Sequence, residues 1–231
     1  MVSPVHDVKT LARRPRQRRA RPSAGATTHK TTASCPHPVP IVANGIYVLA
    51  IMSLGCLPAR HGHDGVYVVV ESPRGSRVKL KLDPALDAFV LSRTLALGVR
   101  YPFDWGFIPS TRAPDGDPVD ALVLHEAATY PGVVIACEPI GVVRCSQRRP
   151  DGSGRERNDR VIAVPEAAPR LEGVRDAHDI SERTRQEIEQ FFQLAILLTG
   201  KDASFEGWDG REAAERLIEE GIRVARQARA A

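Results

Sequence analysis

The chain has 231 residues and a mass of 25.2 kDa, the size of one ordinary domain or of one domain with an appendage. Apolar residues make up 42% of it and charged residues 26%, which favours a packed core and disfavours global disorder. The longest apolar stretch, about Ile46 to Leu57, is interrupted and shorter than the roughly 20 residues that span a bilayer, so no membrane helix is expected.

The cysteines carry information about the compartment. Cys35, Cys56, Cys137 and Cys145 form no Cys-x-x-Cys pair, which disfavours a zinc ribbon or a disulfide scaffold. This usage fits a reducing compartment, and we predict a cytoplasmic protein.

Charge is distributed unevenly along the chain. Residues 1–60 hold nine Lys or Arg and one acid, whereas the remaining residues hold 23 bases and 27 acids. We therefore predict a basic extension over residues 1–60, disordered over 1–44, and a folded domain over residues 61–231. Three interpretations of the extension stay open: sequence upstream of a true start at Met52, an organelle transit peptide, or a nucleic-acid-binding arm around Arg13–Arg21.

Strand patterns begin at Gly65. Val66–Val70 is a run of strand formers, and Arg77–Asp83 alternates strictly, so the two predict an antiparallel hairpin around a turn at residues 72–76. Further short strands are predicted at Phe89–Leu91, Ala121–His125, Val133–Glu138, Ile140–Cys145 and Arg160–Val164. Short strands separated by turn residues are typical of a small barrel.

The last third of the chain predicts two helices. Asp179 and Glu182 have capping-box spacing, and Gly200 suits the end of the first helix. Its apolar face consists of Ile188, Phe191, Phe192, Ala195 and Leu198. The second helix begins near Asp209, with an apolar face of Ala214, Leu217, Ile218, Ile222 and Ala225. Strands followed by helices indicate the α+β class.

An acidic loop is the sharpest chemical feature of the sequence. Asp115, Asp117 and Asp120 lie within six residues, interleaved with Gly116 and Pro118. Carboxylates so close together repel one another unless water or a cation separates them. Carboxylates without His or Cys favour Mg²⁺ or Mn²⁺ over zinc. The alternative is an acidic surface turn, because Asp, Gly and Pro are turn formers.

Cationic residues complete this picture. Lys79 and Lys81 share a strand face, Arg93 follows on the next segment, and Arg160 opens a later strand. Metal-binding carboxylates beside Lys and Arg are the equipment of phosphoryl chemistry. The chain has neither a P-loop nor a GxGxxG motif, so those modes of nucleotide binding have no support.

The motif Tyr101-Pro-Phe-Asp-Trp-Gly-Phe-Ile-Pro109, followed by Asp115-Gly-Asp-Pro-Val-Asp120, resembles soluble family I inorganic pyrophosphatases. The similarity continues in order through about residues 65–226, including Arg160–Pro165 and Gly207-Trp208. The resemblance implies an OB-like five-stranded antiparallel β-barrel with C-terminal helices packed against it. It also implies Mg²⁺-dependent hydrolysis of pyrophosphate to two phosphates by a metal-activated water, and a homo-oligomer.

Roles carried over from the resemblance fall into three groups. Asp117 matches the carboxylate that receives the proton of the attacking water. The positions implied to bind metal are Asp115, Asp120, Glu71 and, beside Asn158, Asp159. The positions implied to bind or line the substrate are Lys79, Arg93, Tyr101, Trp105 and Arg160.

Departures from the family pattern fall on site positions. Lys81 stands where many members have an acid, and Trp105 stands where the motif has a tyrosine. Gln147 and Asn158 stand at metal-ligand aspartates, and a phosphate-binding Tyr-Lys pair is replaced by Ala195 and Ile196. We therefore expect activity that survives but needs more magnesium. Two alternatives are a pyrophosphatase-fold protein that binds phosphate compounds or a partner without turnover, and an OB-type nucleic-acid binder. The second is disfavoured because aromatic residues make up only 5% of the chain.

Overall fold

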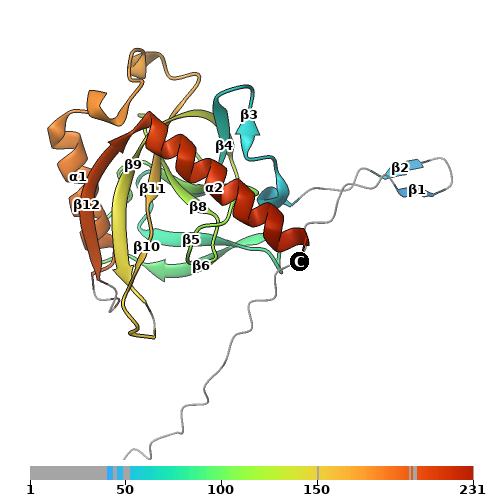
Figure 1. Cartoon of the computed structure of the whole chain (residues 1–231), viewed down its shortest axis with the longest axis horizontal. Helices are drawn as coiled ribbons and strands as arrows, with labels where there is room; N and C mark the ends of the chain where they lie inside the picture. Colours follow the sequence, from blue (N-terminus) through green and yellow to red (C-terminus); the bar gives the residue numbers. More distant parts are fainter. Residues whose placement is uncertain are drawn as a thin grey trace, which may run out of the picture. The chain divides into compact units, whose positions relative to one another are not determined.

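The described part of the chain is mostly β-sheet with two α-helices at the carboxyl-terminal end, which agrees with the predicted α+β class (Figure 1). The computed structural model describes residues 41–43, 46–48, 53–149, 151–197, 199 and 202–230. Most of the predicted basic extension, with the candidate start at Met52, lies outside these residues. Disorder was predicted for all of residues 1–44, but β1 (Ile41–Ala43) is a strand that pairs with β2 (Ile46–Val48).

In the described part of the chain, eight strands form the main sheet. They are β3 (Arg60–His61), β4 (Gly65–Ser72), β7 (Asp104–Ile108), β8 (Val119–Val123), β9 (Val134–Arg148), β10 (Arg155–Arg157), β11 (Arg160–Pro165) and β12 (Ala203–Gly210). The strand β9 is long enough to pair with β4, β10, β11 and β12 along its length. The predicted strands Val133–Glu138 and Ile140–Cys145 are therefore one strand that passes through Pro139.

Five of these strands pair in a closed ring. The order is β9, β11, β8, β7 and β4, and β4 returns to β9 through Val66 opposite Cys137. The β8–β11 pairing is parallel, so the prediction of a wholly antiparallel arrangement was wrong. The reason is topological, because a closed ring with an odd number of strands cannot reverse direction at every step.

The strands β5 (Val78–Asp83) and β6 (Ala88–Thr94) pair with each other in a separate two-stranded sheet. The predicted hairpin between β4 and β5 was therefore wrong. Side chains at the end of β4 replace the missing ladder, since Ser72 Oγ accepts a hydrogen bond from Leu80 N and Glu71 Oε1 accepts one from Leu82 N. These bonds, of 2.9 and 2.8 Å, hold the β5–β6 hairpin against β4.

Both faces of the ring are covered. Successive side chains of a strand point to opposite faces, yet all four residues of Val161–Val164 are buried. Val161 and Ala163 pack in a cluster with Ile218 of α2 (Arg211–Ala230). Ile162 and Val164 pack in a second cluster with Ile188 of α1 (Glu182–Ala195). Each helix therefore supplies the apolar cover of one face.

The helix faces were predicted correctly where they are described. Ile188, Phe191, Phe192 and Ala195 of α1 are buried, as are Ala214, Ile218, Ile222 and Ala225 of α2. Leu217 is partly buried, and Leu198 and Gly200 lie outside the described residues. The described residues also form short 3-10 helices at Leu54–Cys56, Pro169–Leu171 and Ala177–Asp179.

The predicted cap of the first helix was wrong. Ser181 caps α1, because its side chain accepts a hydrogen bond from Thr184 N. Asp179 instead completes a capping box with Asp176 on the preceding 3-10 helix. The same spacing rule thus acts one short element earlier in the chain.

Gly106 allows β7 to lie very close to its neighbour β4. A Cβ atom at this position would lie 2.0 Å from the carbonyl oxygen of Val69, so only glycine fits. The flanking residues Trp105 and Phe107 are buried. The Trp-Gly-Phe segment of the sequence motif is therefore a packing requirement of the ring.

The remaining global predictions concern membranes and thiols. Among the described residues, no helix has the length and apolar character needed to cross a bilayer. Cys137 and Cys145 are free and buried, whereas Cys56 is disulfide-bonded. The sequence disfavoured a disulfide scaffold, and among the described cysteines only Cys56 is bonded.

Candidate active site

The acidic loop is held in place by its own backbone. Asp115 Oδ1 accepts a hydrogen bond of 3.1 Å from Asp117 N, and Gly116 takes a φ of 85°, which glycine adopts without strain. At the end of the loop, Val119 N donates to Thr111 Oγ1, and Asp120 enters β8 opposite Phe107. The carboxylates thus project from a fixed turn joined to the ring.

Two carboxylates of the site are strongly influenced by burial. Burial raises the pKa of Glu71 to about 7, although the Leu82 N–H lowers it, and the charge of Asp120 raises it further. Burial also raises the pKa of Asp120, against the lowering effect of Lys79 and Arg160. Asp115 and Asp117 also raise the pKa of Asp120, which places all four acids in one electrostatic cluster.

The β5–β6 hairpin brings cations to these acids. Lys79 lies opposite Arg93 in the register of the two strands, so two like charges face each other. Burial lowers the pKa of Lys79, while Asp120 and Glu71 raise it. Lys79 Nζ also lies 5.5 Å from the centre of the Trp105 ring, a cation–π distance.

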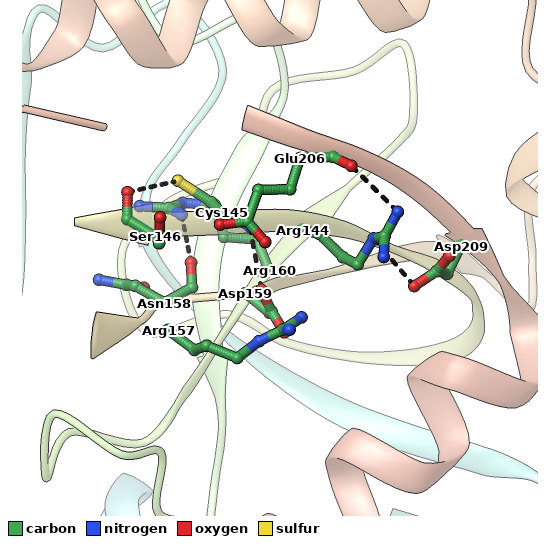
Figure 2. Close-up of polar contacts among 9 residues, drawn as sticks. All are labelled: Arg144, Cys145, Ser146, Arg157, Asn158, Asp159, Arg160, Glu206 and Asp209. Carbon is green, nitrogen blue, oxygen red and sulfur yellow. Dashed lines mark hydrogen bonds and ion pairs between the residues drawn. The ribbon is translucent and has the colours of Figure 1, made fainter. Parts of the chain in front are cut away.

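Arg160 reaches the same cluster from β11. Its guanidinium carbon lies 5.8 Å from the centre of the Trp105 ring and 4.9 Å from that of Phe192. Its Nη1 donates a hydrogen bond to the backbone carbonyl of Asn158 (Figure 2). Arg160 Nε and Trp105 Nε1 are both buried and have no hydrogen-bond partner among the described residues, so two donors are unused beside the Trp105 and Phe192 rings.

Tyr101 and Arg93 link the site to α1. Tyr101 is 4% exposed and packs on Phe191, and burial raises the pKa of its phenol well above the ordinary value. Arg93 Nη1 donates a hydrogen bond to the carbonyl of Ala195, the last residue of α1. A cation is favourable at this helix end. Arg93 therefore contacts Ala195, one of the two positions at which the resemblance implies a phosphate-binding Tyr-Lys pair.

Lys81 was predicted among the cations beside the acidic loop, but the roles carried over from the resemblance did not include it. Its Nζ lies 2.6 Å from Asp117 Oδ2, an ion pair that joins β5 to the acidic loop. Burial alone lowers the pKa of Lys81, but the hydrogen bond and charge of Asp117 raise it above the ordinary value. The signal in the sequence was its position two residues after Lys79, on the same strand face.

Asp159, a predicted metal ligand, contacts residues of β9 and β10. Its Oδ1 accepts a hydrogen bond from Cys145 N, and its Oδ2 binds Arg157 Nη2 at 2.6 Å (Figure 2). Gln147 donates its amide to Glu156 in the same β9–β10 hairpin. The contacts of Gln147 and Asp159 are thus with residues of the segment 145–157.

The donors of the acidic loop suit a hard divalent cation by their chemistry. Asp115, Asp117 and Asp120 offer carboxylate oxygens only, which is the ligand type of Mg²⁺. Among the described residues, no three His, Cys, Asp or Glu side chains are gathered into a ready-made ion cage. The loop therefore supplies suitable ligands, one of which is bound by Lys81.

Comparisons with known proteins agree with this arrangement. A family model described as inorganic pyrophosphatase matches residues 68–226. An inorganic pyrophosphatase of Nostoc is 34% identical over 173 residues, which cover 75% of this chain and 99% of that protein. One of Haloferax volcanii is 40% identical over 160 residues, which cover 69% and 87% of the two chains.

The fold of this chain is also similar to that of a solved structure. The inorganic pyrophosphatase of Thermus thermophilus superposes with a TM-score of 0.69 at 36% identity, and covers 75% of this chain and 99% of its own. The matched segment contains the acidic loop, the β5–β6 hairpin and both helix faces. Because the sequence match spans more than two thirds of the chain and the fold agrees with it, the chain belongs to the inorganic pyrophosphatase family.

Proposed function

We propose that this protein hydrolyses inorganic pyrophosphate to two phosphates with the help of Mg²⁺. The observation that carries the proposal is the meeting of Asp115, Asp117 and Asp120 with Lys79 and Arg160 in one electrostatic cluster. Pyrophosphate is a small polyanion, so it needs cationic groups for its oxygens and a polarised water for attack. This cluster offers both kinds of group.

In this proposal the cations bind the substrate. Lys79, Arg93 and Arg160 contact phosphate oxygens and stabilise the charge on the leaving phosphate. Tyr101 and Trp105 form the wall that orients these cations, since Lys79 and Arg160 both lie over the Trp105 ring. The unused N–H groups of Trp105 and Arg160 are further donors for a phosphate oxygen.

The carboxylates have two roles. Asp115, Asp120 and Glu71 would hold the cation, and Asp117 accepts the proton of the attacking water. When bound, Mg²⁺ lowers the pKa of water and neutralises phosphate oxygens. Asp159, predicted as another ligand, would first have to release Arg157 and Cys145 N.

Three finer statements belong to the same proposal. We infer that the five-strand ring is an OB-like barrel, that the protein acts as a homo-oligomer, and that it acts in the cytoplasm. The domain boundary between residues 60 and 61 is also proposed. No nucleic acid or membrane partner is included.

Phosphate release tests the proposal directly. The full chain is incubated with pyrophosphate and Mg²⁺, and released phosphate is measured with malachite green, with and without a chelator. We expect release that depends on Mg²⁺. If no phosphate is released at any Mg²⁺ or Mn²⁺ concentration, the proposal fails, and the alternative of a protein that binds without turnover takes its place. A salt-sensitive shift of single-stranded DNA would instead support the nucleic-acid reading.

A further inference from the structure

Two lysines on β5 have different surroundings although they share a strand face. Lys79 lies over the Trp105 ring, whereas Lys81 forms a 2.6 Å ion pair with Asp117 Oδ2. Asp117 lies 36 residues further along the chain, so this pair joins two separate elements. Lys81 therefore touches the proposed catalytic carboxylate itself.

Lys81 supplies one of the positive charges that surround Asp117. The acids Glu71, Asp115, Asp117 and Asp120 lie among the cations Lys79, Lys81, Arg93 and Arg160, and Arg112 lies beside Gly116 of the same loop. A carboxylate at position 81 would make the local charge two units more negative. That difference equals the charge of one Mg²⁺ or Mn²⁺ ion.

The ammonium of Lys81 also competes for space at Asp117. A Mg²⁺ ion binds a carboxylate oxygen at about 2.1 Å, so an ion on Asp117 Oδ2 would lie within about 5 Å of Lys81 Nζ. Two cations at this separation repel each other strongly near a protein surface. Because Lys81 is tethered to β5, its local concentration does not fall when metal is scarce.

We propose that Lys81 is a built-in cation that takes the place of one divalent ion at Asp117. The chain then binds one ion fewer than the same site with a carboxylate at position 81. The inference rests on the proposed function, because it concerns the cations that accompany the Asp115–Asp120 loop. It makes Lys81 a positioning residue, since the ammonium acts on Asp117.

Metal binding without substrate tests this inference. Mn²⁺ is titrated calorimetrically into the chelator-stripped full chain for wild type, Lys81→Glu, Lys81→Gln and Arg77→Glu. Arg77 is exposed just before β5, so Arg77→Glu is a control with the same change in net charge. We expect Lys81→Glu to bind one more Mn²⁺ per chain than wild type, and Arg77→Glu to bind the wild-type number.

The neutral variant Lys81→Gln keeps the test decisive if the charge reversal Lys81→Glu fails to fold. Lys81→Gln should keep the wild-type number of ions but lower the Kd for Mn²⁺ by about five- to tenfold, the effect of removing one charge about 5 Å from the ion. An unchanged count in folded Lys81→Glu, or an unchanged Kd in Lys81→Gln, overturns the inference. Phosphate release by the same preparations reports separately on the proposed function.

Discussion

Two regions of this molecule use their charges in opposite ways. In the acidic-loop region, residues 115–120 with β5 and β6, charged groups meet across elements far apart in the chain, as Lys81 does with Asp117. In the hairpin region, residues 144–159, they pair with one another or with the adjoining strand β12, as Arg157 does with Asp159 and Arg144 does with Asp209 (Figure 2). The ion pairs of the hairpin region hold neighbouring strands together, whereas the charges gathered at the acidic loop are placed to act on a small polyanion.

The comparison also separates what the chain keeps from what it changes. The acidic loop has the three carboxylates that the resemblance implies, Asp115, Asp117 and Asp120, whereas Lys81 on β5 and, in the hairpin region, Gln147 and Asn158 stand where the resemblance implies acids. The predictions below test whether the first region alone carries the chemistry.

The largest effect is expected at Asp117. Asp117→Asn keeps the shape of the side chain but removes the proton acceptor, so kcat for phosphate release should fall by about a hundredfold or more. Asp151→Asn, in an exposed turn of the hairpin region, is the matched control and should retain wild-type kcat. Equal losses in the two variants would abolish the distinction between the regions.

Arg93 is expected to have the next largest effect. Arg93→Ala removes a phosphate contact and the hydrogen bond to the Ala195 carbonyl, so kcat/KM should fall by about ten- to a hundredfold. Arg183→Ala removes an exposed arginine of α1 that pairs with Glu187, and should leave both constants unchanged. Unchanged kinetics for Arg93→Ala would return Arg93 to a structural role at the end of α1.

Glu71 predicts a pH dependence of stability for the metal-free protein. Its pKa is raised in the folded state to about 7, so the folded state binds the proton more tightly than the unfolded state. The free energy of unfolding should therefore fall as the pH rises from about 4.5 to 7, by up to about 3 kcal/mol from this group. Urea unfolding with chelator present measures it, with Glu71→Gln as the reference.

The free energies of unfolding of wild type and Glu71→Gln, plotted against pH, must diverge for the prediction to hold. Wild type should lose stability relative to Glu71→Gln as the pH rises through this window. Parallel curves would show that Glu71 is as well solvated in the folded chain as in the unfolded one.

The smallest expected effect lies in the hairpin region. Asn158→Asp adds a charge at a family ligand position, so the Mg²⁺ concentration for half-maximal activity should fall by about threefold. Gln190→Glu, on the exposed side of α1, controls for net charge. A rise in the Mg²⁺ requirement on Asp159→Asn would show that the hairpin region does supply a carboxylate to the ion.

Alternation and apolar periodicity were sufficient to predict β4, β5, β11 and the buried faces of both helices. They failed for β7, because all five residues Asp104–Ile108 are buried and no alternation remains. They failed also for β12, where Gly207 has a φ of 117° and the register with β9 shifts. Strands with both faces covered, or with a bulge, lose the pattern that identifies them.

From residue patterns alone the site was predictable only as far as local spacing reaches, and the roles of Glu71, Lys79, Arg93 and Arg160 in it were assigned through the family resemblance. Asp115, Asp117 and Asp120 follow from six consecutive residues, and their loop is where it was expected. The Lys81–Asp117 pair depends on β5 leaving the main sheet to pair with β6, which no local pattern encodes. The pairing of Asp159 with Cys145 N depends likewise on the return of the chain through β10.

The closure of the ring has a kinetic consequence. Val66 of β4 meets Cys137 of β9 across the whole intervening segment, whereas Val78 meets Thr94 within a single hairpin. Contacts between distant residues form late because their loop-closure entropy must be overcome first. We expect pulse-labelling hydrogen exchange during refolding to protect β5–β6 amides before β4–β9 amides; the reverse order would contradict this. The hairpin that carries Lys79, Lys81 and Arg93 would then be formed before the ring that aligns its acidic partners.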